Sequence, residues 1–125
     1  MMRRWVFHIL VAVLLVSCTA NGAGSAKPTA QSNWQDVPIM SDAVASNESM
    51  PVTGYQYTIN TDMKTVERFY VDEMKTSGWE LLGKGDMSGQ DFKAFALWFA
   101  KGEKIVTIDI WQKNNIIHVA IVPEP

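Results

Sequence analysis

The sequence predicts an α+β fold of two layers: a strand, then a helix, then a four-stranded antiparallel meander, with the one helix packed on one sheet face. Two observations lead to this prediction. Apolar residues recur at helical spacing between Thr61 and Ser77, and they alternate with other residues in the stretches on either side. The chain has 125 residues, 47% of them hydrophobic, which is room for one small domain.

The first predicted strand and the helix are adjacent in the sequence. Alternation across residues 52–60 indicates the strand, and the stretch Thr61–Ser77 then changes period. Thr61 is a candidate N-cap and Gly78 can end the helix in a left-handed conformation. The apolar stripe of this helix consists of Met63, Val66, Phe69, Tyr70 and Met74.

The meander is predicted from four further stretches joined by short turns. These stretches are Trp79–Lys84, Phe92–Ala100, Lys104–Gln112 and Ile116–Val122. A two-residue turn at Lys101-Gly102 or at Gly102-Glu103 is expected between the second and third stretches. A turn at Asn114-Asn115 places Ile110 opposite Val119 and Trp111 opposite His118. Gly83, Gly85 and Gly89 are expected in the turn after the first of these strands, and residues 34–51 are expected to be irregular.

The beginning of the chain has the features of an export signal. A positive start, Met1–Arg4, precedes the apolar run Trp5–Val16. As a helix this run is about 18 Å long, too short for a hydrocarbon core of ~30 Å. The alternative is an uncleaved short transmembrane helix.

The residues that follow this run are Leu15-Val16-Ser17-Cys18, with the only cysteine of the chain at the end. This motif resembles the lipobox of bacterial lipoproteins. The resemblance implies cleavage before Cys18, acylation of Cys18 by fatty chains such as palmitate, and attachment to a membrane outside the cytoplasm. Thr19 in the next position implies the outer membrane in a diderm host, with the domain in the periplasm or elsewhere in the cell envelope. Two or three acyl chains would give durable anchoring.

The predicted organisation therefore has three parts. Residues 1–17 are a lipoprotein signal peptide, residues 18–33 are the lipidated cysteine and a flexible tether rich in small polar residues, and residues 34–125 are the α+β domain. The domain resembles small exported bacterial lipoproteins that have no established activity. The residues that carry this resemblance are Val37-Pro38-Ile39-Met40, Tyr57-Thr58-Ile59, Val66, Phe69-Tyr70, Met74, Gly78-Trp79 and Leu81.

Several kinds of chemistry find no support in the sequence. After the expected cleavage His118 is the sole histidine, so neither a Cys–His nucleophile nor a multi-histidine metal site is expected. No phosphate-binding glycine motif is present, and a formal net charge of -2 gives no basic stripe for nucleic acid. We expect no catalytic residues, metal or cofactor.

One sheet face is a candidate binding surface. With the helix on the Ile108 and Val119 face, the opposite face carries Trp98, Asp109, Trp111 and His118. Two tryptophans on a nominally solvent-facing surface indicate a contact with a partner. The alternative is that residues 34–51 cover this face and make the tryptophans ordinary core.

The expected function is that of an envelope lipoprotein with a non-catalytic binding or accessory domain. Its partners would be the membrane, through Cys18, and an envelope protein, glycan or lipid, through Trp98, Trp111 and His118. A second possibility is a small-ligand carrier with a pocket between the sheet face and residues 34–51. A hydrolase of unknown type ranks third.

Overall fold

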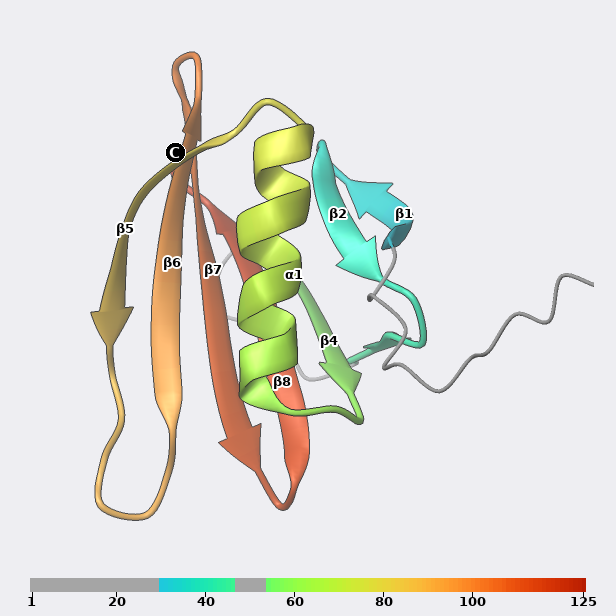
Figure 1. The fold of residues 1–125 in the computed structure, drawn as a ribbon, viewed down its shortest axis with the longest axis vertical. Helices are drawn as coiled ribbons and strands as arrows, with labels where there is room; N and C mark the ends of the chain where they lie inside the picture. Colours follow the sequence, from blue (N-terminus) through green and yellow to red (C-terminus); the bar gives the residue numbers. More distant parts are fainter. Residues whose placement is uncertain (1–29, 47–53) are drawn as a thin grey trace, which may run out of the picture.

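The computed structural model describes residues 30–46 and 54–125, which form a mostly β domain with one helix (Figure 1). β1 and β2 pair in a two-stranded sheet, and the other strands form a six-stranded antiparallel sheet in the order β3-β4-β8-β7-β6-β5. The elements are β1 (Ala30–Trp34), β2 (Val37–Met40), β3 (Val44–Ala45), β4 (Tyr55–Ile59), α1 (Met63–Thr76), β5 (Glu80–Asp86), β6 (Ala94–Lys101), β7 (Lys104–Lys113) and β8 (Ile116–Pro123).

The predicted architecture, a strand and a helix followed by a four-stranded meander with the helix alone covering one sheet face, is wrong. The large sheet has six strands because β4 pairs with β8 and β3 pairs with β4. A second sheet, β1–β2, lies beside α1 (Figure 1). The fold is therefore mostly β, with a single helix in the part of the chain that the structure describes.

The extra strands come from a region expected to be irregular. Within residues 34–51, the described part contains β2 and β3, and β1 starts at Ala30, inside the range predicted as a tether. Val37, Ile39 and Met40 are all buried. Burial of these apolar side chains offsets the entropy lost when the segment is ordered. The signal was weak in the sequence because the strands are short and interrupted by turn residues.

Helix α1 begins one residue later than predicted, with Asp62 rather than Thr61 as its N-cap. The Asp62 carboxylate accepts hydrogen bonds from the Thr65 backbone N–H at 2.8 Å and from the Thr65 hydroxyl at 2.9 Å. At the other end Gly78 has a φ of 87°, and the Trp79 N–H donates to the Met74 carbonyl at 2.9 Å. The helix therefore ends at the predicted glycine in a left-handed conformation.

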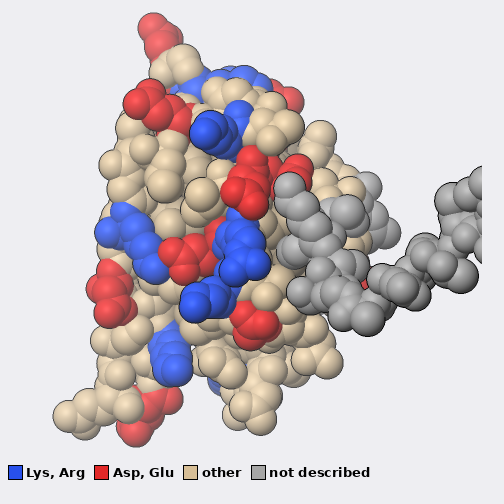
Figure 2. Space-filling model, in the orientation of Figure 1, with Lys and Arg blue, Asp and Glu red and all other residues tan. Residues whose placement is uncertain are grey.

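The main core lies between α1, β2 and one face of the large sheet. The buried stripe of α1 consists of Val66, Phe69, Tyr70 and Met74. On the sheet, Leu97 pairs with Ile108, and Ile110 pairs with Val119; the second pair is the one that the Asn114-Asn115 turn predicted. Figure 2 shows acidic and basic side chains interspersed over the side of the molecule that carries α1. The helix thus buries one stripe and presents a mixed-charge surface to solvent.

No helix within residues 30–46 and 54–125 is sufficiently long and hydrophobic to span a bilayer. The predicted signal peptide and Cys18 lie outside the described residues.

Candidate functional site

The structure brings together the four residues predicted to share a sheet face. Trp98 lies on β6, Asp109 and Trp111 on β7, and His118 on β8. Their alternation with the buried core residues places them on the side of the large sheet that faces away from α1. We call the surface around these four residues the tryptophan face.

The aromatic rings of Trp111 and His118 form one ridge of this face. The two residues are directly opposite each other in the β7–β8 pair. Their rings are stacked, with centroids 5.2 Å apart and an interplanar angle of 13°. His118 is only 9% exposed, and its buried Nδ1 has no hydrogen-bond partner in the described part of the chain. Stacking, together with the strand pairing, therefore sets the orientation of the imidazole.

Trp98 forms the second ridge by lying against the glycines of the edge strand. Gly83 pairs directly with Trp98, and Gly85 follows two residues along β5. A Cβ atom at Gly85 would lie 2.5 Å from Cη2 of Trp98, closer than any real contact, whereas one at Gly83 would lie 3.8 Å from the ring. The indole thus rests on the backbone of β5. These glycines were predicted to mark a turn, but they lie within a strand and make room for a ring.

Asp109 lies between the two ridges. Its neighbours across the sheet are Ala96 on β6 and Ala120 on β8, so the floor around it is made of small side chains. The carboxylate is half-buried, and burial raises the pKa of Asp109 above its ordinary value. Within residues 30–46 and 54–125 it has neither a hydrogen bond nor an ion pair.

The described part of the segment expected to cover this face lies elsewhere. β2 contacts α1 and buries Val37 and Ile39 in the main core, and Trp34 stacks on Tyr55 with ring centroids 6.0 Å apart. β1 and β2 therefore pack on the α1 side, and β3 extends the edge of the large sheet beside β4. The described part of this segment thus forms neither a third layer nor a pocket over the tryptophan face. Residues 47–51 lie outside the described residues.

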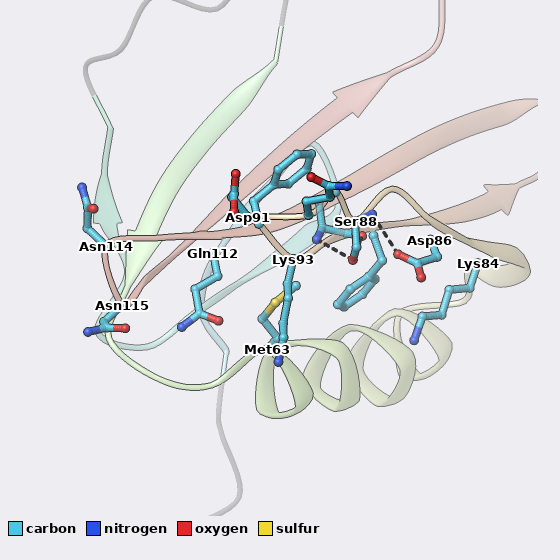
Figure 3. A pocket seen from close by; sticks show the side chains of 14 residues that line it. Met63, Lys84, Asp86, Ser88, Asp91, Lys93, Gln112, Asn114 and Asn115 are labelled. Carbon is cyan, nitrogen blue, oxygen red and sulfur yellow. Dashed lines mark hydrogen bonds between the residues drawn. The ribbon is translucent and has the colours of Figure 1, made fainter.

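Sequence reasoning missed a concave site on another part of the molecule, shown in Figure 3. A cavity of about 800 Å³ lies between the start of α1, the loop 87–93 and the β7–β8 turn. The residues that line it are Met63, Lys84, Asp86, Ser88, Gly89, Gln90, Asp91, Phe92, Lys93, Ala94, Phe95, Gln112, Asn114 and Asn115. The sequence feature that could have indicated this site is Phe92, an aromatic residue in a loop of turn formers. In the structure its side chain is 51% exposed.

Local hydrogen bonds hold the walls of this cavity. Asp86 accepts from the Ser88 N–H at 2.8 Å, and the Ser88 hydroxyl bonds both backbone groups of Ala94 at 3.1 and 3.2 Å. Lys84 is paired with Glu67 at 2.6 Å, and its ammonium lies 4.5 Å from the centroid of the Phe95 ring. The cavity therefore combines an apolar floor with a rim of both charges and amides.

Among the described residues no group of three or more histidine, cysteine, aspartate or glutamate side chains is arranged to hold a metal ion. No protein-family model matches the chain, and no curated protein sequence matches it.

Proposed function

We propose that this chain is a lipid-anchored protein of the cell envelope whose domain binds an envelope partner through the tryptophan face, without catalysis. The anchor rests on the lipobox Leu15-Val16-Ser17-Cys18 at the end of an apolar run. The binding role rests on the geometry of the sheet face.

The observation that supports binding most directly is the set of side chains left on this face. Trp98 and Trp111 are only partly buried, because in the described segment that could have covered them β2 packs beside α1 and β3 lies at the edge of the large sheet. Large aromatic side chains, tryptophan above all, contribute most of the binding energy in many protein interfaces. Here they lie beside a carboxylate, Asp109, that has no partner among the described residues. A solvent-facing role alone gives no reason to place two indoles there.

Binding fits this face better than acid–base catalysis. Asp109 and His118 share no hydrogen bond, and the ring of His118 is engaged in stacking on Trp111. A general acid–base pair needs hydrogen-bond reach to a common substrate atom. The carboxylate of Asp109, which has Ala96 and Ala120 as its cross-strand neighbours, is better suited to pair with a positive charge on a bound partner.

A second proposal is a small-ligand carrier, and the cavity in Figure 3 favours it. A volume of about 800 Å³ falls within the range of small-molecule sites. This cavity is not the pocket expected between residues 34–51 and the sheet face. Its test is Phe92→Ala, which removes an exposed ring from the lining and should weaken uptake of an apolar dye, with Phe92→Tyr as the conservative control.

The anchor is tested by metabolic labelling with a fatty-acid analogue. Wild type should be labelled and sediment with membranes, Cys18→Ala should be unlabelled, and Ser17→Ala should behave like wild type because it leaves the thiol in place. An unlabelled wild type that keeps its initiating methionine would contradict the anchor.

The binding role is tested by capture of partners from detergent-solubilised envelopes. The double variant Trp98→Ala/Trp111→Ala should lose a partner that wild type retains. Trp34→Ala is the matched control, because it removes an indole from the α1 side of the molecule. Equal recovery by wild type and the double variant would contradict binding through this face.

A further inference from the structure

We infer that the partner of the tryptophan face is a protein that presents an arginine side chain to Asp109, between Trp98 and Trp111. This inference rests on the proposed binding function and names the chemistry of the partner. It is argued from the charge, the rings and the shape of the same surface.

The first argument is charge complementarity. Asp109 is half-buried and has no cationic neighbour on its own face among the residues that the structure describes. The register surrounds it with Ala94, Ala96 and Trp98 from β6, Thr107 and Trp111 from β7, and His118, Ala120 and Val122 from β8. His118 is the only other titratable group in this ring of neighbours. A partly desolvated carboxylate without a counter-ion is unfavourable, so a bound cation at this point removes a cost that the free protein carries.

The second argument concerns the rings on either side of the charge. Trp111 lies two residues from Asp109 on β7, and Trp98 is a diagonal neighbour on β6. One side of the Trp98 indole rests on Gly83 and Gly85, and the side chain as a whole is only partly buried. Indole faces attract cations, and a planar guanidinium can stack on an indole while it donates two hydrogen bonds to a carboxylate. Arginine satisfies both features at once.

The third argument is shape. Two concave sites of the described residues are the cavity around loop 87–93 and a smaller one near Trp34 and Trp79, and neither of these two includes Asp109, Trp111 or His118. A free small cation needs an enclosing pocket to hold it, whereas an open sheet face suits a side chain supplied by a large surface. The ring of His118 stacks on Trp111 and so belongs to the same aromatic ridge.

The experiment compares two peptides that differ only in charge. The full chain, in an uncharged polyoxyethylene detergent, is titrated with acetyl-Gly-Arg-Gly-amide and with the same peptide carrying citrulline, the neutral isostere of arginine. The readout is the indole N–H NMR signals, assigned with Trp→Phe variants. The arginine peptide should shift the signals of Trp98 and Trp111 and leave Trp34 and Trp79 unmoved, and it should bind roughly tenfold more tightly than the citrulline peptide.

Asp109→Asn is the decisive variant because it keeps the shape of the side chain. It should weaken the arginine peptide roughly tenfold and leave the citrulline peptide unchanged. Asp72→Asn is the matched control, since Asp72 is an exposed acid on α1. Far-UV circular dichroism of each variant verifies the fold.

The outcomes separate this inference from the function on which it depends. Equal affinity for the two peptides, or an Asp109→Asn variant that binds arginine as wild type does, overturns the arginine assignment. The assignment is also overturned if an oligosaccharide or phosphocholine shifts Trp98 and Trp111 while the arginine peptide does not, although the face would then still bind a ligand. Loss of the proposed function itself would appear separately, as partner capture that the Trp98→Ala/Trp111→Ala variant leaves intact.

Discussion

The hydroxyl groups of Tyr57 and Tyr70 lie 2.6 Å apart and hydrogen-bond to each other in the core. Neither side chain is exposed to solvent, and the pair joins β4 to α1. Burial raises the pKa of each phenol well above its ordinary value, so both stay neutral in physiological conditions. A buried polar pair of this kind is stable only while both partners are present.

Removal of both hydroxyls should therefore cost less than the sum of the two single removals. Tyr70→Phe leaves the Tyr57 hydroxyl without this partner, and we expect a loss of about 1–3 kcal/mol in the free energy of unfolding. In the double variant Tyr57→Phe/Tyr70→Phe neither orphan hydroxyl remains, so its loss should be smaller than the sum of the single losses. Urea denaturation of the four proteins measures the coupling, and strictly additive losses would contradict it.

Asp62→Ala should destabilise α1 by about 1 kcal/mol, because it removes the N-cap. Hydrogen bonds from the Thr65 backbone and then from its hydroxyl lower the pKa of Asp62 below its ordinary value. The stabilisation is thus present above the ordinary aspartate pKa and is lost as the pH falls through the lower folded-state value.

Thermal denaturation of wild type and Asp62→Ala across this acidic range measures that loss. Plotted against pH, the Tm values of the two proteins should converge at the lowest pH. Asp72→Ala on the same helix is the control and should show no such convergence, because Asp72 is not the cap.

Asp109→Asn should raise the Tm at neutral pH, whereas Asp62→Ala should lower it. Burial raises the pKa of Asp109, so the folded state binds its proton more tightly than the unfolded state does. Ionisation therefore costs stability as the pH rises through the window above the ordinary aspartate pKa. The gain from the amide should shrink and vanish as the pH falls below that window. A gain that is constant with pH would show that the carboxylate charge is not its cause.

Gly85→Ala should displace the Trp98 indole from the edge strand. The new methyl group would meet the ring at 2.5 Å, so the side chain has to move, at a cost of about 1 kcal/mol or more. Gly83→Ala is the matched control, since its methyl group reaches ordinary contact distance at 3.8 Å. The indole N–H signal of Trp98 in an NMR spectrum should shift in the first variant and stay near its wild-type position in the second.

Much of the candidate site followed from strand pairing over short distances. Turn residues set the β7–β8 register and thus placed Trp111 opposite His118, as predicted. The packing of Trp98 on Gly83 and Gly85 did not follow, because glycines in a polar stretch indicate a turn as readily as a strand that another ring covers. The cavity around loop 87–93 depends on the position of that loop relative to α1, which no local pattern encodes.

The sequence by itself determined the helix at residues 63–76 and the hairpins of β6, β7 and β8, because hydrophobic period and turn chemistry act over a few neighbouring residues. Only the tertiary structure decided that β4 pairs with β8, and that β1 and β2 form a second sheet beside α1. Tyr57 pairs with Val119, although most of the described chain lies between them in the sequence. Such a long-range contact forms only because the folded domain as a whole buries both side chains. Because β1 and β2 pack beside α1 in this fold, they do not cover the tryptophan face.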